Sequence, residues 1–557
     1  MLSLRRWHTP QAILLLPITA HSQRVRSMSF LIAQVASSTP IKLPSVEYSA
    51  IAPELIMIIG AIVVMLISSL VSKHVSKTTS IAVGAAVAIV SLADSIYLGF
   101  QSGTSGANKA VLSGAVALDK FAIFFYALFS IVALLTVLLG RELMNLDRGR
   151  VPDFVTLVLL STSGAMLMAS ALDLIVLFLG LEILSIALYV LVAIESNSAR
   201  GRESSVKYFM LGGFSSAVFL YGVALVYGAT GSTNLGQILT FLANNLFKSN
   251  GVLLAGIGMI MVGLGFKISA VPFHFWAPDV YQGAPSPVTG FMAATAKAAG
   301  FAALLRVFYS GFITYQSDWV PVIGALSVLT LLVGAILAVL QKDIKRTLAY
   351  SSINQAGFIL LGLYAVSAKG VGASLYFLIT YSVVIVGAFA TVGAMEKLLG
   401  KQGLELEDLR GLSKKSPFLT FSFVALILAQ AGAPFTTGFL SKFNVVLATV
   451  NARHYPVALV AMISAAIAAF FYLRMALLPF RAASGESQTL APGGAGLEDT
   501  QYAGSSAVLV KEEEAVAVKT KIDSVSVVIG IAVVVTIGLG IWAGPLVDLA
   551  NRASLFF

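Results

Sequence analysis

Long apolar runs, each of about 20 residues, alternate along this chain with short polar segments. A bilayer core about 30 Å thick is crossed by about 20 helical residues, so each run predicts one membrane-spanning helix. Fourteen such runs can be distinguished, and together they predict an all-α polytopic membrane protein. The predicted ranges are 51–72, 79–100, 119–140, 152–171, 173–194, 205–229, 250–276, 288–313, 320–340, 346–367, 372–395, 416–449, 455–480 and 524–550.

The distribution of basic residues predicts how these helices are oriented. Lys and Arg are concentrated in the loops that follow odd-numbered helices and are sparse in the loops that follow even-numbered ones. Because cytoplasmic loops carry this excess, the loops after odd-numbered helices are predicted to lie inside the cell. With fourteen spans, both termini are then expected on the outer face.

Two segments depart from the helical pattern. Residues 1–45 form an N-terminal extension whose basic start and short apolar run "AILLLPITA" resemble a signal peptide, and Met28 is an alternative start. Residues 481–523 are rich in Gly, Ala and Ser and contain the acidic run "KEEE", which indicates a flexible cytoplasmic insertion. We assign no chemistry to either segment.

The composition limits the kinds of chemistry that this chain can perform. Hydrophobic residues make up 58% of the chain and charged residues only 11%, and the net charge of +10 is scattered among loops, which argues against a nucleic-acid-binding face. There is no cysteine, so iron–sulfur ligation, thiolate catalysis and disulfides are excluded for this chain, and five histidines offer too few axial pairs for haem. We therefore expect no bound cofactor and no metal here, and chemistry carried by side-chain protons and charges.

Four ionisable residues lie near the middle of predicted spans, and they are the candidate functional residues. They are Glu182 in "LFLGLEILSIAL", Lys267 in "GLGFKISAVPFHFW", Lys297 in "AATAKAAGF" and Lys442 in "TGFLSKFNVV". Each costs about 2.5–3.5 kcal/mol at a helix centre on insertion scales, and together they cost on the order of 10 kcal/mol. Such residues usually mark ion or proton pathways.

The structural alternative is that these charges only tie helices together, or that long side chains reach to the membrane surface. Reaching to the surface suits Arg306 and Arg474, which lie towards span ends, better than it suits the central four. Three lysines cannot all be paired with one glutamate, so we expect some lysines to be neutral part of the time or hydrated. Glu182 is the expected partner that tunes the protonation of Lys267.

Helix-breaking residues accompany two of the lysines. Pro272 follows Lys267 by five residues, and "AGAPFTTGF" at 431–439 directly precedes Lys442. Broken backbone is tolerated within a bilayer only where protein or a hydrated cavity satisfies it, and paired breaks are typical of inverted-repeat transporters. His274, just past the first break, is a candidate proton relay, with an ordinary interfacial histidine as the equally weighted alternative.

Four stretches of the chain carry a family resemblance. They are "FKISAVPFHFWAPDVYQGAPSPVTGFMAATAKAAGFAALLRV" (266–307), "KRTLAYSSINQAGF" (345–358), "KYFMLGGFSSAVFLYGVALVYGATG" (207–231) and "AGAPFTTGFLSKF" (431–443). They resemble subunit N of the bacterial NADH-quinone oxidoreductases, that is, of respiratory complex I, an ND2-like and antiporter-like subunit. The motif "PFHFWAPDVYQGAP" is the most specific, whereas "AYSS" is shared with the wider antiporter-like superfamily.

The resemblance implies a domain organisation. It implies about fourteen helices, with helices 4–8 and 9–13 as two inverted repeats and with helices 7 and 12 broken. The resulting ranges are 46–150 for helices 1–3, 151–313 for the first repeat, 314–480 for the second repeat, and 524–557 for helix 14 and the C-terminus.

The resemblance also implies a function. The chain would be a proton-translocating membrane-arm subunit of an NADH:quinone oxidoreductase, a translocase of the bacterial inner membrane that couples quinone reduction to proton transfer. The family's charged positions match Glu182 in helix 5, Lys267 in helix 7, Lys297 in helix 8 and Lys442 in helix 12. NADH, FMN, iron–sulfur clusters and quinone would be bound by partner subunits, and neighbouring antiporter-like and small membrane subunits would be the contacts in the bilayer.

Three other functions remain open from the residues. One is a cation/proton antiporter subunit of the Mrp type, which shares the fold and the lysines and would show Na⁺-dependent transport without a quinone reductase. Another is a purely structural membrane-arm subunit, in which the buried charges only hold helices together. The third is a subunit of a hydrogenase or of an NDH-1-like complex with another electron donor, because the donor would be bound by partner subunits.

Overall fold

The computed structural model describes residues 47–70, 76–105, 109–144, 146, 150–195, 199–245, 250–482, 523–553 and 555. The predicted N-terminal extension and nearly all of the predicted insertion at 481–523 lie outside the described residues.

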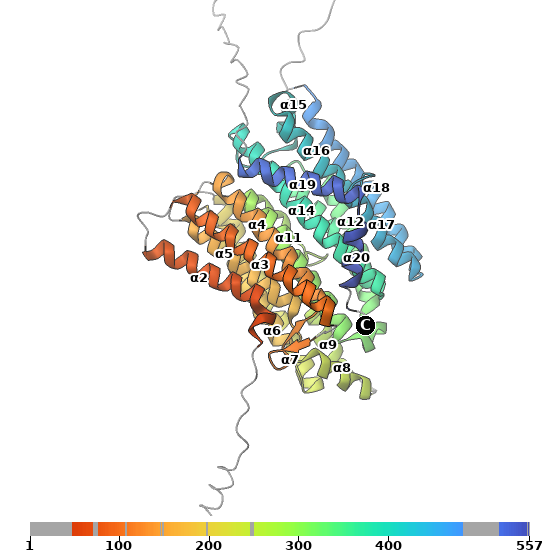
Figure 1. The fold of residues 1–557 in the computed structure, drawn as a ribbon. Helices are drawn as coiled ribbons and strands as arrows, with labels where there is room; N and C mark the ends of the chain where they lie inside the picture. The colour runs from red at the N-terminus through yellow and green to blue at the C-terminus, as the bar shows by residue number, and fades with distance from the viewer. Residues whose placement is uncertain are drawn as a thin grey trace, which may run out of the picture. The chain divides into compact units, whose positions relative to one another are not determined.

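Helices account for nearly all of the described residues (Figure 1). The first half contains η1 (Tyr48–Ile51), α2 (Ala52–Leu70), α3 (Lys77–Ser105), β1 (Lys109–Val111), β2 (Val116–Leu118), α4 (Lys120–Leu143), α5 (Arg150–Ser170), α6 (Leu174–Val192), α7 (Ala199–Thr230), α8 (Leu235–Asn244), α9 (Gly251–Lys267), α10 (Trp276–Gly283) and α11 (Ser286–Ser310). The second half contains η2 (Ile313–Tyr315), α12 (Gln316–Val339), α13 (Ile344–Tyr364), α14 (Ala368–Leu399), η3 (Leu406–Leu409), α15 (Leu412–Lys415), α16 (Pro417–Ala431), α17 (Thr437–Asn451), α18 (Tyr455–Leu477), η4 (Leu478–Phe480), α19 (Ser524–Ile541) and α20 (Gly544–Arg552).

The all-α polytopic prediction is confirmed, and each of the fourteen predicted ranges overlaps at least one helix. Among the described residues, 11 helices are long and apolar enough to cross a membrane. The predicted range 250–276 falls on α9 and the break after it and reaches only the first residue of α10, whereas 416–449 falls on α16 and α17 with a break between them. The helix α13 carries many polar residues. The number of crossings, fourteen, therefore stays a prediction, as do the domain boundaries.

Helix starts are set by short polar side chains. Asp119, Asp173, Asn234, Asp343 and Asp523 each stand at an N-cap, and each side chain accepts hydrogen bonds from the first-turn backbone N–H groups. These groups have no partner within the helix, so the caps fix where the helices begin. The short helix α8 was not predicted, because its ten residues fall below the length of a membrane span.

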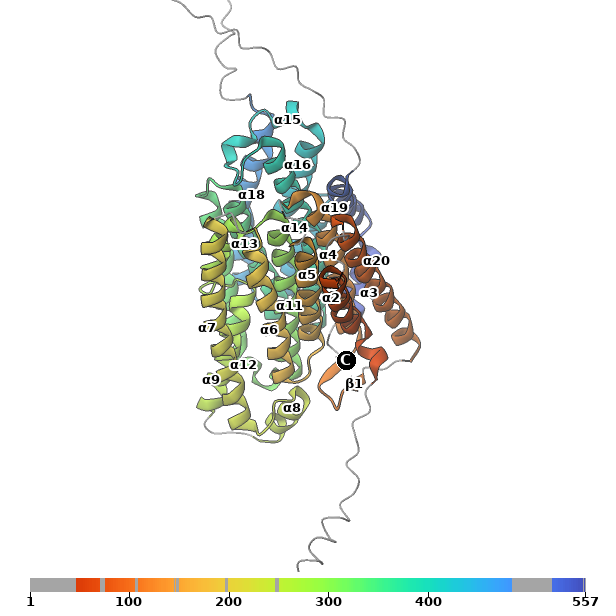
Figure 2. The ribbon, with the colours of Figure 1, turned by 90° about the vertical axis from the view of Figure 1, so that its left-hand side faces the viewer.

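The helix α11 occupies the centre of the described bundle. Every residue from Ser286 to Tyr309 is buried, and α11 packs against α4, α5, α9 and α14. Figure 2 shows α11 and α14 inside the bundle, with α7 and α3 towards its edges. The two edge helices expose large apolar side chains, Phe214 and Phe100 among them, which is the surface expected against lipid or against other subunits.

Small residues allow close packing of α5 and α6. A Cβ added to Gly164 would lie 2.8 Å from the carbonyl oxygen of Gly180, and one added to Gly180 would lie 3.0 Å from the carbonyl oxygen of Gly164. Backbones that approach this closely are typical of helix pairs in membranes. This pair places Glu182, two residues beyond Gly180, on a rigid support.

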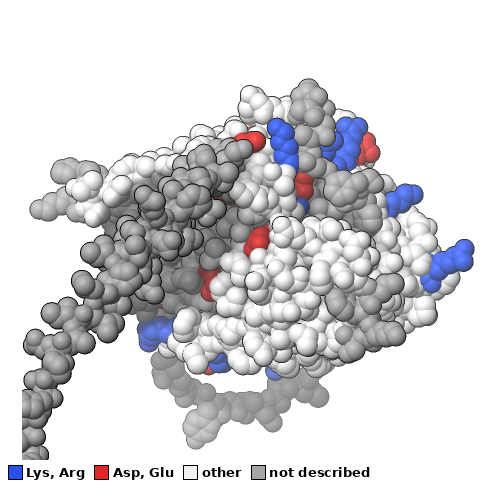
Figure 3. Space-filling model, turned by 90° about the horizontal axis from the view of Figure 1, so that it is seen from below, with Lys and Arg blue, Asp and Glu red and all other residues white. Residues whose placement is uncertain are grey.

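One end of the molecule carries the small antiparallel hairpin of β1 and β2, together with α8. Seen from below, the described surface is mostly uncharged, with scattered basic side chains near its edge (Figure 3). The loops at this end follow even-numbered predicted helices, and their place on the outer face stays a prediction.

Candidate functional site

Lys267 is the last residue of α9, at the first helix break. Its side chain is 3% exposed, and Nζ lies 5.8 Å from the ring centre of Tyr189 and 5.7 Å from that of Tyr208. Pro272, which has no N–H and disfavours a helical residue before it, helps to keep the chain non-helical until α10 begins at Trp276. The break thus places a buried ammonium group against aromatic rings at the carboxyl end of a helix.

Glu182 lies on α6 near Lys267 but does not form the close pair expected from the sequence. Among the described residues, no ion pair joins Glu182 to Lys267, although their charges interact electrostatically. One carboxylate oxygen of Glu182, Oε1, is buried without a hydrogen-bond partner in the described part of the chain. The carboxylate is therefore positioned to influence Lys267 from a distance, and the two groups are separated in this structure.

Lys297, in the middle of α11, has partners that the sequence did not reveal. Its Nζ donates to both the backbone carbonyl and the hydroxyl of Ser352 on α13. The Ser352 hydroxyl also lies 2.7 Å from the hydroxyl of Tyr381 and 3.4 Å from that of Tyr281. The serine pair in "AYSS" was the available signal, because hydroxyls in a spanning helix are natural partners for a buried ammonium.

Lys267 and Lys297 belong to neighbouring elements. A Cβ added to Gly300, one turn after Lys297, would lie 3.3 Å from Cβ of Lys267 and 2.7 Å from Cγ2 of Ile268. The glycine thus lets α11 contact the end of α9. Tyr208, next to Lys267, stacks on Trp276 with the ring centres 4.7 Å apart, and the ring of Trp276 lies 6.2 Å from that of Tyr281, whose hydroxyl is 3.4 Å from that of Ser352.

Lys442 lies on α17, directly after the second break. Its Nζ donates to the backbone carbonyls of Gln430 (2.9 Å) and Ala431 (3.0 Å), the last two residues of α16. Carbonyls at a helix end lack partners within the helix and carry partial negative charge, so they stabilise an ammonium group. Gly432 makes the turn possible with φ of 92°, a left-handed conformation that favours glycine.

The helix α13 connects the surroundings of Lys297 and Lys442. Ser351, next to the Ser352 that binds Lys297, lies 2.6 Å from the hydroxyl of Tyr472 and donates to Oε1 of Gln430 at 3.1 Å. One turn further on, Gln355 donates to the carbonyl of Gln430 at 2.8 Å, the same carbonyl that binds Lys442. Two of the three lysines are therefore linked through one polar helix.

His274 lies within the first break. It is 4% exposed, its ring is 4.6 Å from that of Phe275, and its Nδ1 is buried with no hydrogen-bond partner among the described residues. No described contact joins His274 to the ammonium of Lys267. Its role as a proton relay stays a prediction.

Arg306 corrects one prediction from the sequence. Its side chain does not reach to the membrane surface but is 2% exposed, donating to both carboxylate oxygens of Asp119 (2.8 and 2.9 Å) and to the carbonyl of Ala169 (2.7 Å). Burial would raise the pKa of Asp119, but the guanidinium charge outweighs burial and holds that pKa below its ordinary value. The side chain of Arg474, in contrast, is exposed.

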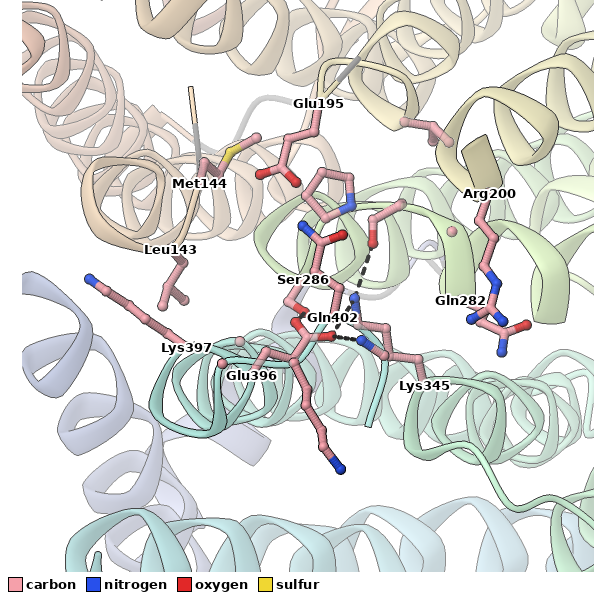
Figure 4. Close-up of a pocket in the computed structure, with 18 of the residues that line it drawn as sticks. Leu143, Met144, Glu195, Arg200, Gln282, Ser286, Lys345, Glu396, Lys397 and Gln402 are labelled. Atoms are coloured by element: carbon pink, nitrogen blue, oxygen red, sulfur yellow. Dashed lines mark hydrogen bonds and ion pairs between the residues drawn. The ribbon is translucent and has the colours of Figure 1, made fainter. Parts of the chain in front are cut away.

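A cavity of about 520 Å³ opens among the ends of α4, α7, α11 and α14 (Figure 4). Within it the carboxylate of Glu396 pairs with Lys345 at 3.1 Å and accepts hydrogen bonds from the Ser286 hydroxyl at 2.7 Å and the Gly403 N–H at 3.1 Å. This site was not predicted, because each of its residues belongs to a loop or a helix end. Lys345 lies two turns before Ser352 on α13, so this cavity is two helical turns away from the contacts of Lys297.

The two broken helices and the buried lysines define a class, the antiporter-like membrane subunits. A family model described as "NADH:quinone oxidoreductase/Mrp antiporter, TM" matches residues 171–468. Among solved structures, this chain is similar to a chain of respiratory complex I from Thermus thermophilus with bound aureothin. The two are 30% identical with a TM-score of 0.69, and the match covers 90% of this chain and 99% of that chain. The fold is also shared with a chain of the Mrp complex from Dietzia, with 22% identity, TM-score 0.74, and coverage of 90% of this chain and 96% of that chain.

Curated relatives give the particular family. NADH-quinone oxidoreductase subunit N of Mycobacterium bovis is 36% identical over 92% of this chain and 98% of the relative. The subunit N of a Parafrankia species is 39% identical over 78% of this chain and 86% of the relative. The chain belongs to the family of NADH-quinone oxidoreductase subunit N.

Proposed function

We propose that this chain is a proton-translocating membrane-arm subunit of a bacterial NADH:quinone oxidoreductase, in the inner membrane with both termini outside. The observation that carries the proposal is the set of three buried lysines, two of them linked by hydrogen bonds through α13. A buried amine that gains and loses a proton with its surroundings is suited to relay protons between such positions. Membership of the subunit N family supports the same function.

The proposed roles follow from the contacts. Glu182 modulates Lys267 electrostatically and Lys267 passes its proton on to Lys297. Lys442 is the last acceptor in this series of three buried lysines. His274 is proposed to exchange protons at the first break. Each proton moved against 100 mV costs about 2.3 kcal/mol, so proton transfer along these lysines needs a driving reaction outside this chain.

That driving reaction belongs to partner subunits. They would bind NADH, FMN, iron–sulfur clusters and quinone, while this chain binds none of them and contributes no redox centre. Its own contacts would be neighbouring antiporter-like and small membrane subunits, reached through the exposed apolar faces of edge helices.

The test uses membrane vesicles that contain the assembled complex. Lys267→Ala is expected to reduce both proton pumping and quinone reduction while assembly stays intact, because the relay loses its first lysine. Lys342→Ala, which removes an exposed lysine in the loop before α13, is the matched control and should leave both activities unchanged. Unchanged pumping in assembled Lys267→Ala complexes would refute the proposal.

The Mrp-type alternative rests on the shared fold and on the joint name of the matching family model. It predicts Na⁺-dependent proton movement in vesicles without NADH or quinone. Our proposal predicts that proton movement requires both.

A further inference from the structure

A polar cavity lies at one end of the helices α14, α17 and α20, and its wall contains none of the three lysines of the candidate site. Its volume is about 140 Å³. Three residues of the wall lie at helix ends: Lys369 is the second residue of α14, Asn451 is the last of α17, and Asn551 is the last but one of α20. Since α14 is long and apolar enough to cross a membrane, its first turn is expected at the membrane surface. The cavity is therefore expected at the level of the lipid headgroups.

Five polar side chains of the wall have no partner among the described residues. The hydroxyl of Tyr376, a residue only 1% exposed, forms no hydrogen bond, and Lys369 takes part in no ion pair. The other three are asparagines whose amide groups bond to no described residue: Asn444, Asn451 and Asn551. Buried polar groups are rarely left unsatisfied in proteins, so this group around one cavity indicates a polar ligand.

The charge of the wall selects an anion. Among the described residues, Lys369 is the one charged member of the wall, and no acidic residue lines the cavity. Two exposed cations, Arg453 and Arg552, directly follow the ends of α17 and α20 that form the wall or lie on them. Asp548 on α20 is exposed and lies outside the wall. The cavity thus attracts negative charge.

The donor groups favour a phosphate in particular. A lysine ammonium, asparagine amides and a tyrosine hydroxyl come from three helices, which suits an anion with several oxygens. The volume is on the order of ten times what one water molecule requires, so a group of this size fits. Leu447, which is 43% exposed, and Val547 form an apolar side of the wall. A phospholipid presents this combination of a phosphate and an apolar chain.

We propose that this cavity binds a phosphate group, and that the headgroup of an anionic phospholipid supplies it. Lys369 pairs with the phosphate, the asparagine amides and Tyr376 donate to its oxygens, and Leu447 contacts the first part of an acyl chain. A Cβ on Gly372 would overlap Oδ1 of Asn551, so this glycine keeps room for one of the amides. The site takes no part in the proposed proton relay.

The test is photolabelling of the assembled complex, purified in a detergent that contains no phosphate. A trace of phosphatidylglycerol with a photoreactive acyl chain is added, and labelled peptides are identified by mass spectrometry. We expect labelling of α17 and α20 near Leu447 and Val547. Diacylglycerol with the same acyl chain lacks the phosphate and should label these peptides only weakly.

Variants of the wall test which groups hold the phosphate. Lys369→Gln keeps a long polar side chain without the charge and should reduce labelling about tenfold, whereas Lys369→Arg keeps the charge and should retain most of the labelling. Asn444→Asp is nearly isosteric but replaces two donors with a negative charge, so it should also reduce labelling. Lys342→Gln, which removes an exposed lysine outside the wall, is the control. Native gel electrophoresis checks that each variant complex is assembled.

Three results would each overturn the phosphate site: no labelling of the wild-type complex, equal labelling by diacylglycerol, or equal labelling of assembled Lys369→Gln complexes. Displacement of the label by millimolar inorganic phosphate would support the phosphate site and assign free phosphate, in place of a lipid headgroup, as its ligand. None of these results depends on proton pumping, so the phosphate site and the proposed function fail separately. If Lys267→Ala pumps normally while the labelling is as expected, the function is wrong and the phosphate site stands.

Discussion

The two broken helices hold their lysines at equivalent places by different means. Lys267 ends α9 itself, whereas Lys442 begins on α17 and reaches back across the break to the end of α16. Both ammonium groups therefore belong to the carboxyl end of a half-helix. The ammonium of Lys442 is hydrogen-bonded to two carbonyls, but the described contacts of Lys267 are with aromatic rings and a distant carboxylate.

This difference teaches that the same sequence pattern can hold one lysine by hydrogen bonds and the other by aromatic contacts. Hydrogen bonds to a charged group contribute about 1.5–3 kcal/mol each, whereas a cation–aromatic contact contributes about 0.5–2 kcal/mol. Lys442 is thus the more firmly held of the two.

The largest effect is expected from filling the close contact at the second break. A Cβ on Gly438 would lie 1.7 Å from the carbonyl oxygen of Ala429, so Gly438→Ala should separate α16 from α17 and prevent assembly of the complex. Gly258→Ala in α9 is the control, because its Cβ would meet no described atom within 4 Å. Native gel electrophoresis of solubilised membranes measures assembly, and normal assembly of Gly438→Ala would show that the two halves are not rigidly packed.

A smaller effect, on activity alone, is expected from replacing either lysine with arginine. Arginine keeps the charge and can still bond to the α16 carbonyls, but it hardly releases its proton. Lys267→Arg and Lys442→Arg should therefore assemble while pumping falls by about 10²-fold, the usual loss on removing a proton-transfer group. Normal pumping by Lys442→Arg in vesicle assays would mean that Lys442 only caps α16.

The smallest effects are expected from the tyrosines around the two lysines, and they separate the two regions. The hydroxyl of Tyr472 is bonded to Ser351 and Gln355, whereas the hydroxyl of Tyr208 has no hydrogen-bond partner within the described ranges. Tyr472→Phe should lower pumping by about tenfold, since it leaves a buried polar group unsatisfied, and Tyr208→Phe should change it less than about twofold. Equal losses in the two variants, measured in the same vesicle assay, would contradict the inference that the hydrogen-bond network is confined to the second break.

The sequence was sufficient to predict the helical ranges, the four buried ionisable residues and the two breaks, because each is a local property. Apolar length predicts a span, and a charge within a span is visible without knowing its neighbours. The partners were not predictable, because they depend on side-chain direction across helices far apart in sequence. Ser352 lies 55 positions from the Lys297 that it binds, and Asp119 lies 187 positions from Arg306.

The same reason accounts for the separation of Glu182 from Lys267. Both residues were recognised, but whether their side chains meet depends on how α6 packs beside α9. The Lys345 and Glu396 pair was missed for a different reason. Its residues lie at helix ends, where charged side chains are ordinary and carry no signal.

The complete burial of α11 has a consequence for biosynthesis. A helix with no lipid-facing side from Ser286 to Tyr309, and with Lys297 at its middle, gains little from entering the bilayer alone. The helices that pack around α11 include α14, which ends at Leu399. At typical synthesis rates, translation of α14 is completed on the order of 5–20 s after that of α11. During that interval the nascent chain must keep α11 beside earlier helices or within the insertion machinery, so this subunit is expected to depend on assistance before its second half has been made.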